Sequence, residues 1–299
     1  MVELRALLKR NTKLFFKDKG MFFTSLITPL ILLVLYSTFL AKVYRDSLAM
    51  SIPQGFSISE KLIDGAVGAQ LFSSLLAVCC VTVAFCSNML MVQDKANNTV
   101  LDLYITPVKP SSLALGYYLS TGISTLIICY VTMLASFVYM AVVGWYLSVI
   151  DVILLIVDVF LIVLFGTALS SVINFFLNSQ GQISAVGTIV SSGYGFICGA
   201  YMPISQFSEG LQRVIMFLPG TYGTSLLRNH AMRGSFEEMR AEGLPDEAVD
   251  SMMDALDCNL YFFDAKVEIG VMYAVVAVSV ALLIGLYILM NYLKIRKSR

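Results

Sequence analysis

Long stretches without a charged residue constrain this chain more than any other feature. A transmembrane helix needs roughly 20 apolar residues, because the hydrocarbon layer is about 30 Å thick and a helix rises about 1.5 Å per residue. The 299-residue chain is 58% hydrophobic and 13% charged, against about 45–50% and 25% in soluble domains. We therefore exclude a soluble fold and predict an all-α integral membrane protein. The stretches without Asp, Glu, Lys or Arg include 21–41, 65–93, 110–150, 159–208 and 269–293.

We divide these stretches into six spans within a single transmembrane domain, residues 1–299. Gly144 and Trp145 mark a turn between the third and fourth spans, because Gly permits tight turns and Trp favours the membrane interface. The polar run 178–182 separates the fourth span from the fifth, and Pro203 follows the end of the fifth. The predicted spans cover about 21–44, 65–93, 112–143, 150–177, 183–202 and 268–293.

Basic residues flank both ends of the membrane region. Flanks rich in Lys and Arg stay in the cytoplasm, so both termini are predicted to be cytoplasmic and the number of spans even; seven spans would disagree with this bias. Residues 1–20 predict an amphipathic helix lying on the membrane surface, with a plain basic flank as the alternative. The net charge is zero, which does not suggest a nucleic-acid partner.

The predicted loop 94–110, between the second and third spans, has the pattern of a short rigid helix. Thr99 is placed to cap it, with Asp102 three residues later, and Pro107 is placed to end it. A short helix on the cytoplasmic side would suit contact with a soluble protein.

The segment after the fifth span is apolar but broken by prolines. We predict an outer re-entrant hairpin here, which requires that its backbone be buried in protein. The outer region 203–267 is acidic beyond Arg228, and one or two short helices are expected between Glu237 and Leu260, with a break at 243–245. Two interpretations of this acidic region stay open: a solvated cap, and a vestibule or partner site that attracts cations.

These motifs, in this order, resemble the permease subunit of a type-2 ABC exporter. The resemblance covers nearly all of the chain. Asn98 stands where that family usually has Gly, and Leu101 stands where it usually has an acid. The late motifs are similar at 199–203, 218–222 and 227–228, and their marked residues are Pro203, Pro219, Tyr222 and Arg228. The residues that match the family's coupling loop are Asp94, Lys95, Thr99, Leu103, Thr106 and Pro107, with Asp102 as the nearest acid.

The resemblance implies alternating access that a separate ATPase subunit drives. The chain has no phosphate-binding loop of the Gly-x-x-x-x-Gly-Lys-Ser/Thr type, so ATP and Mg are expected on the ATPase and no cofactor on this chain. A second permease copy or a paralogue would complete the transporter in a bacterial plasma membrane. The uncharged interior suggests export of a hydrophobic or amphipathic small molecule, such as a drug, an antibiotic or a lipid-like compound.

Two further features within the spans are candidates for function. Asp158 lies about two turns inside the fourth span, where a charge is costly. Three interpretations stay open: it faces the translocation path, it pairs with a structural partner, or the helix starts deeper and Asp158 lies near the headgroups. A stripe of small residues along the fifth span would allow close helix contact, either within the chain or at a dimer seam. The stripe consists of Gly187, Ser191, Gly195 and Gly199.

The remaining reactive side chains give no catalytic or metal site. The cysteines have no metal-ligand spacing with His230, the only histidine, and neither His230 nor Cys258 is assigned a role. Other classes of protein remain open: an ion-gradient-driven secondary transporter, a membrane enzyme, and a non-transporting immunity or scaffold protein that binds the same ATPase.

Overall fold

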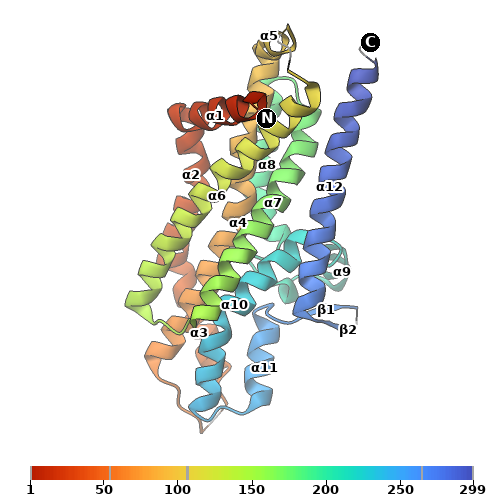
Figure 1. Ribbon diagram of the computed structural model, residues 1–299. Helices are drawn as coiled ribbons and strands as arrows, with labels where there is room; N and C mark the ends of the chain where they lie inside the picture. The colour runs from red at the N-terminus through yellow and green to blue at the C-terminus, as the bar shows by residue number, and fades with distance from the viewer. Residues whose placement is uncertain (1, 54, 106–107, 264, 298–299) are drawn as a thin grey trace.

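The computed structural model describes residues 2–53, 55–105, 108–263 and 265–297 and is almost entirely helical. Among these residues, five helical segments are long and apolar enough to cross a membrane, so the chain is an all-α, multi-pass membrane protein. Both ends of the chain lie at the same end of the molecule in Figure 1. The five segments are Lys19–Met50, Glu60–Ala96, Ser111–Val143, Val149–Phe175 and Ile269–Leu293.

Helix α4 (Glu60–Ala96) is the central element of the bundle. Its side chains are buried on every face, which fits a helix that is apolar all round rather than on one stripe. Helices α2 (Lys19–Leu35), α6 (Pro110–Val143), α7 (Val149–Phe175), α8 (Gln180–Ile197) and α10 (Pro219–Ala241) all pack against it. Helix α12 (Ile269–Lys297) packs on the outside, against α7 and α10.

The first span is one continuous helix with a local change of pitch. Helix α2 passes through a π-helical turn at Tyr36–Leu40 into α3 (Ala41–Met50). The helix is therefore longer than the predicted 21–44. Helix α1 (Val2–Lys17) precedes it, lies across the bundle at the end where the chain begins, and packs on α6 (Figure 1).

The predicted fifth span corresponds to α8, which is not among the five long apolar helices. Its sequence includes two glutamines and several glycines, serines and a threonine, so its apolar character is lower than that of the other spans. The helix ends at Ile197, short of the predicted Met202. Gly199 adopts φ +73°, the left-handed conformation that commonly ends a helix and that glycine adopts without strain.

The segment after α8 is more helical than predicted. A 3₁₀ turn (Ile204–Gln206) and α9 (Glu209–Ile215) lead into α10, which continues beyond Arg228 as far as Ala241. The expectation that the acidic loop begins at Arg228 is therefore wrong, because most of α10 is buried between α4, α7 and α12. Gly243, at φ +96°, lies in the break at 242–245 before α11 (Asp246–Ala255).

A small antiparallel hairpin connects α11 to α12 and was not predicted. Strands β1 (Leu260–Phe262) and β2 (Ala265–Val267) pair with Leu260 opposite Val267, Tyr261 opposite Lys266 and Phe262 opposite Ala265. Strands this short carry little alternation of polar and apolar residues, so sequence periodicity gives no signal for them. The hairpin lies at the opposite end of α12 from the C-terminus (Figure 1).

The closest approach of α4 and α7 generates the first testable prediction. A Cβ atom at Gly166 would lie 2.8 Å from the carbonyl oxygen of Cys80 and 3.0 Å from the Cα of Val81. We expect Gly166→Ala to lower the free energy of unfolding by about 1–3 kcal/mol, because backbone atoms would have to move apart. Thermal unfolding of the purified protein in detergent measures this.

Gly285→Ala is the matched control, because no atom lies within 4 Å of a Cβ at that position in α12. It should leave the melting temperature unchanged or raise it slightly, since Ala favours a helix over Gly. Equal melting temperatures for the two variants would contradict the tight α4–α7 contact.

Candidate functional site

The end of α4 and the short helix α5 (Thr99–Ile105) form the first candidate site. The chain reverses between them at Asn98, whose φ is +59°. Left-handed backbone is most easily adopted by glycine and, among other residues, by Asn and Asp. The left-handed backbone explains how Asn98 can replace the glycine that the coupling loop of type-2 ABC exporters usually has at this position. Helix α5 lies at the tip of α4, beyond the ends of α6 and α7 (Figure 1).

Asp94 is held inside the chain at the base of this loop. Two guanidinium nitrogens of Arg10 on α1 donate to its two carboxylate oxygens at 2.8 and 3.1 Å. The hydroxyl of Tyr117 on α6 donates to the same carboxylate at 2.6 Å. The hydrogen bond to Asp94 raises the pKa of the Arg10 guanidinium, which therefore keeps its charge. With Asp94 only 6% exposed, this carboxylate joins α1, α4 and α6.

Lys95 joins the loop to the end of α7. Its ammonium donates to the carbonyl oxygens of Asn174 at 3.1 Å, Phe175 at 2.9 Å and Leu177 at 3.3 Å. A helix C-terminus carries unpaired carbonyls and partial negative charge, so a cation stabilises it. The ammonium also lies 5.5 Å from the ring centre of Phe175. Asp94 and Lys95 therefore both bind to the chain's own helices.

The other predicted coupling residues are distributed differently. Thr99 is the first residue of α5 and is half-buried, as is Leu103, which packs against the apolar cluster around α1 and α6. Asp102 is exposed. Thr106 and Pro107 lie outside the described residues. Among the described charged residues of this loop, Asp102 is thus the one that α5 presents to solvent.

A groove between α2, α4 and α8 forms the second candidate site. Its volume is about 860 Å³, and its walls combine aliphatic side chains with hydroxyl groups. Such a surface suits an amphipathic molecule, because apolar area supplies most of the attraction and a few polar groups orient the ligand. The residues with hydroxyl or amide groups on its walls include Thr24, Thr28, Gln93, Gln180, Ser184, Thr188, Ser191 and Ser192.

Two residues of the small-residue stripe, Gly187 and Ser191, line this groove, and the members of the stripe contact different neighbours. A Cβ at Gly187 would lie 3.0 Å from the end of the Met89 side chain on α4. Gly195 is covered by the ring of Tyr201, whose hydroxyl donates to the carbonyl of Ser191 at 3.3 Å. Gly199 ends the helix. Gly187 is therefore an internal α8–α4 contact, whereas the face that carries Thr188 is exposed.

Asp158 is fully buried and has two partners, neither of which was predicted. One carboxylate oxygen lies 2.6 Å from Nδ1 of His230 on α10, and the other accepts a hydrogen bond of 2.5 Å from the Tyr273 hydroxyl on α12. Asp158 does not line the groove between α2, α4 and α8. This geometry favours the structural partner over the translocation path. The only available signal was that the single acid deep in the spans and the single histidine both needed a partner.

Arg228 is buried in α10 and binds three segments. It donates to Asp257 at 2.9 Å, to the carbonyl of Gly199 at 2.5 Å and to the hydroxyl of Ser74 on α4 at 3.3 Å. Asp257 also accepts from the backbone amide of Ile204 at 2.9 Å. Burial raises the pKa of the Asp257 carboxyl, and Arg228 opposes that shift.

The other residues of the late motifs lie at or near the beginnings of helical elements. Pro203 precedes the 3₁₀ turn, and Pro219 is the first residue of α10, where its missing amide hydrogen costs nothing. The hydroxyl of Tyr222 donates to the carbonyl of Met216 at 2.6 Å and fixes the turn between α9 and α10. Burial raises the pKa of the Cys258 thiol to about 12, which leaves it protonated and unreactive.

Comparison with known families gives one match over most of the chain. The family model described as ABC-2 type transporter matches residues 2–231. This range includes α1, α5, α8 and more than half of α10, with Arg228. No curated protein sequence matches the chain.

The Arg10–Asp94 pair generates the second prediction. We expect Asp94→Asn to loosen α1, because the bidentate charge-assisted pair becomes a weaker contact worth about 1.5–3 kcal/mol less. Hydrogen exchange of α1 amides, followed by mass spectrometry, should become faster in this variant.

Arg5→Gln is the control, because Arg5 is an exposed cation on the same helix. Arg10→Gln breaks the pair from the other side. Arg5→Gln removes one positive charge from α1, as Arg10→Gln does, but leaves the contact with Asp94 intact. Equal exchange rates of α1 in Arg5→Gln and Arg10→Gln would show that the pair does not hold the helix.

Proposed function

The chain belongs to the ABC-2 type transporter family, and from that premise we propose that it is the membrane-spanning subunit of an ATP-driven exporter. Members of this family are transmembrane subunits that work with a separate ATPase. In this proposal the ATPase carries the ATP and Mg, and this chain forms the path for a hydrophobic or amphipathic small molecule. The assembly lies in a bacterial plasma membrane with both termini of this chain in the cytoplasm.

The observation that carries the proposal is the way α5 is held. It extends from the bundle at the end where both chain termini lie, and it exposes Asp102. Its base is bound to α1 through Arg10 and Asp94 and to the end of α7 through Lys95. A protein that pushes on α5 therefore pushes on several helices at once, which is what a docking helix for an ATPase requires.

The groove between α2, α4 and α8 supports the transport part of the proposal. Its hydroxyl-bearing walls fit an amphipathic cargo, and it opens along the exposed face of α8. We propose that α8 is the sixth span and that a second permease copy or a paralogue covers this face. Eighteen residues give a helix of about 27 Å, close to the thickness of the hydrocarbon layer. A partner would shield the polar side chains that lower the apolar character of α8.

An ion-gradient-driven transporter is a weaker explanation of the same structure. Such a transporter needs an acid or base that faces the substrate path near the middle of the membrane. Asp158, the acid deep inside α7, is bound by His230 and Tyr273 and does not line the groove. A non-transporting immunity or scaffold protein would still bind the ATPase, and ATP-dependent flux separates it from an exporter.

The docking of an ATPase on α5 is the third prediction. We expect Asp102→Lys to reduce the amount of co-purified ATPase by about fivefold or more, because reversing an interface charge weakens association. The tagged chain is extracted from its native membrane in mild detergent, and its partners are quantified by mass spectrometry. ATP-dependent uptake of a lipophilic fluorescent dye into inverted vesicles should fall in parallel.

Lys266→Glu is the control, because Lys266 is an exposed charge on β2, at the other end of α12 from the C-terminus. It should retain the ATPase fully. A chain that purifies without any ATPase in several detergents would contradict the proposed function, and an unaffected Asp102→Lys variant would remove α5 as the docking site.

Covering of the groove by a second copy is the fourth prediction. Thr188 lies on the exposed face of α8 and lines the groove, so a short bifunctional maleimide should link two copies of Thr188→Cys in the membrane. Leu282→Cys on α12 is equally exposed but lies outside the groove and should give no linked dimer. The unmodified chain, whose cysteines are all buried, gives the background. No dimer from Thr188→Cys would show that an identical copy does not cover the groove.

A further inference from the structure

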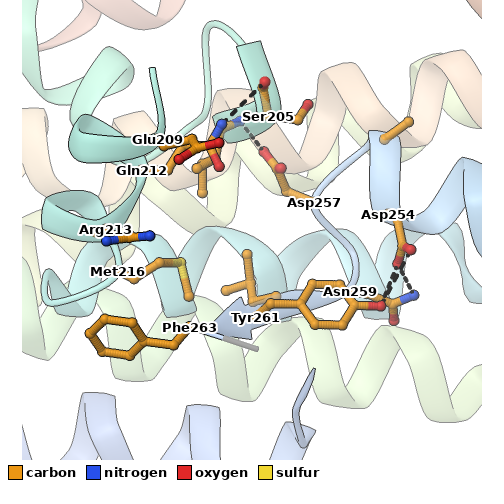
Figure 2. Close-up of a pocket in the computed structure, with 13 residues that line it drawn as sticks. Ser205, Glu209, Gln212, Arg213, Met216, Asp254, Asp257, Asn259, Tyr261 and Phe263 are labelled. Atoms are coloured by element: carbon orange, nitrogen blue, oxygen red, sulfur yellow. Dashed lines mark hydrogen bonds between the residues drawn. The ribbon is translucent and has the colours of Figure 1, made fainter. Parts of the chain in front are cut away.

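A second cavity, separate from the groove, lies between α9, the end of α11 and strand β1. Its volume is about 630 Å³. Figure 2 shows Glu209 and Arg213 on one side of this cavity and Asp254 on the other, with the rings of Tyr261 and Phe263 along its lower edge. Neither the coupling of α5 nor the groove uses these residues.

The cavity offers groups of opposite charge at different places. Among the described residues, none forms a hydrogen bond or an ion pair with the side chain of Glu209 or Arg213, both of which line the cavity. Asp254 accepts from the Asn259 amide at 2.7 Å and from the Tyr261 hydroxyl at 3.1 Å, and its carboxylate keeps further acceptor capacity. Asp257 is different, because Arg228 and Ile204 already bind it. The available charges are thus one cation and two carboxylates.

The position of the cavity relative to the membrane follows from α12. Strand β2 ends at Val267, and the apolar span begins at Ile269, so the hairpin lies where α12 enters the apolar layer. The surface beside the cavity is apolar and exposed, as expected for contact with acyl chains. Its residues are Leu211, Val214, Phe217 and Phe263. A polar cavity next to such a surface lies at the depth of lipid headgroups.

We propose that this cavity binds a zwitterionic phospholipid headgroup of the phosphoethanolamine type, with its acyl chains against the exposed apolar side chains of α9. The Arg213 guanidinium matches the phosphate, because its planar set of donors pairs with phosphate oxygens. Glu209 and Asp254 match the primary ammonium, which also favours the face of an aromatic ring such as Tyr261. A simple soluble cation would leave Arg213 unmatched, and an anionic lipid would face two carboxylates.

This inference does not depend on the proposed function, because it requires only that the chain span a membrane. The test uses the full chain with whatever subunits co-purify, in detergent, with phosphatidylethanolamine, phosphatidylcholine and phosphatidylglycerol added in equal amounts. Native mass spectrometry counts the lipids retained at increasing collision energy. We expect phosphatidylethanolamine to be retained about fivefold more than the other two lipids, equivalent to roughly 1 kcal/mol.

Variants decide whether the retained lipid occupies this cavity. Arg213→Gln and Asp254→Asn should each abolish the preference, whereas Lys266→Gln and Glu247→Gln, exposed charges that do not line the cavity, should preserve it. Glycerophosphoethanolamine, which has the headgroup but no acyl chains, should compete only weakly. Binding of this soluble compound without retention of the lipid would overturn a membrane source for the ligand. Equal retention of the three lipids, or a preference unchanged in both cavity variants, would overturn the site.

Discussion

The buried guanidinium of Arg228 is the interaction on which the arrangement of the second half of the chain depends. A charge in this environment is tolerated only when it is paired and hydrogen-bonded. Both terminal nitrogens of Arg228 are paired, with Asp257, the carbonyl of Gly199 and Ser74, and only Nε has no hydrogen-bond partner among the described residues. These partners come from the connection before α12, the end of α8 and the middle of α4. One side chain therefore binds the chain just after α8 and the connection after α11 to the bundle.

Helix α4 links the Arg228 interaction to the pair between Arg10 and Asp94, which lies near the C-terminal end of α4. Ser74 and Asp94 are both on α4, and at about 1.5 Å per residue the twenty residues between them correspond to roughly 30 Å. At one position α4 binds Arg228, and at the other it binds Arg10 and Tyr117. The groove beside α8 lies between these two fixed regions. A rigid central helix that is held at two levels suits a protein in which outer helices move and the centre does not.

The sequence allowed prediction of the features that depend on local chemistry. Absence of charge marked the long helices, and Gly243 marked the break before α11. The sequence did not allow prediction of contacts that depend on tertiary packing. Asp158 and His230 are 72 residues apart in the chain and meet only because α7 packs against α10. Arg228 was identified by its motif, but its partner Asp257 was hidden among many acids of the outer region. The extent of α10 was missed for the same reason, since burial by α4, α7 and α12 makes a mixed sequence helical.

The loop at Asp94 shows why a motif alone does not separate contact residues from positioning residues. Asp94 and Lys95 carry the charges expected of a docking surface, yet their partners are in α1, α6 and α7 of the same chain. Their charges matter because they are satisfied internally: Asp94 joins two helices to α4, and Lys95 neutralises the carbonyl end of α7. Asp102, one turn into α5, is free to face a partner. Charges of both signs at the base of this loop thus bind it to the bundle, and in the proposed docking the exposed Asp102 is the charge available for recognition. In the proposed mechanism, a force applied at α5 would reach the bundle through the internal contacts of Asp94 and Lys95.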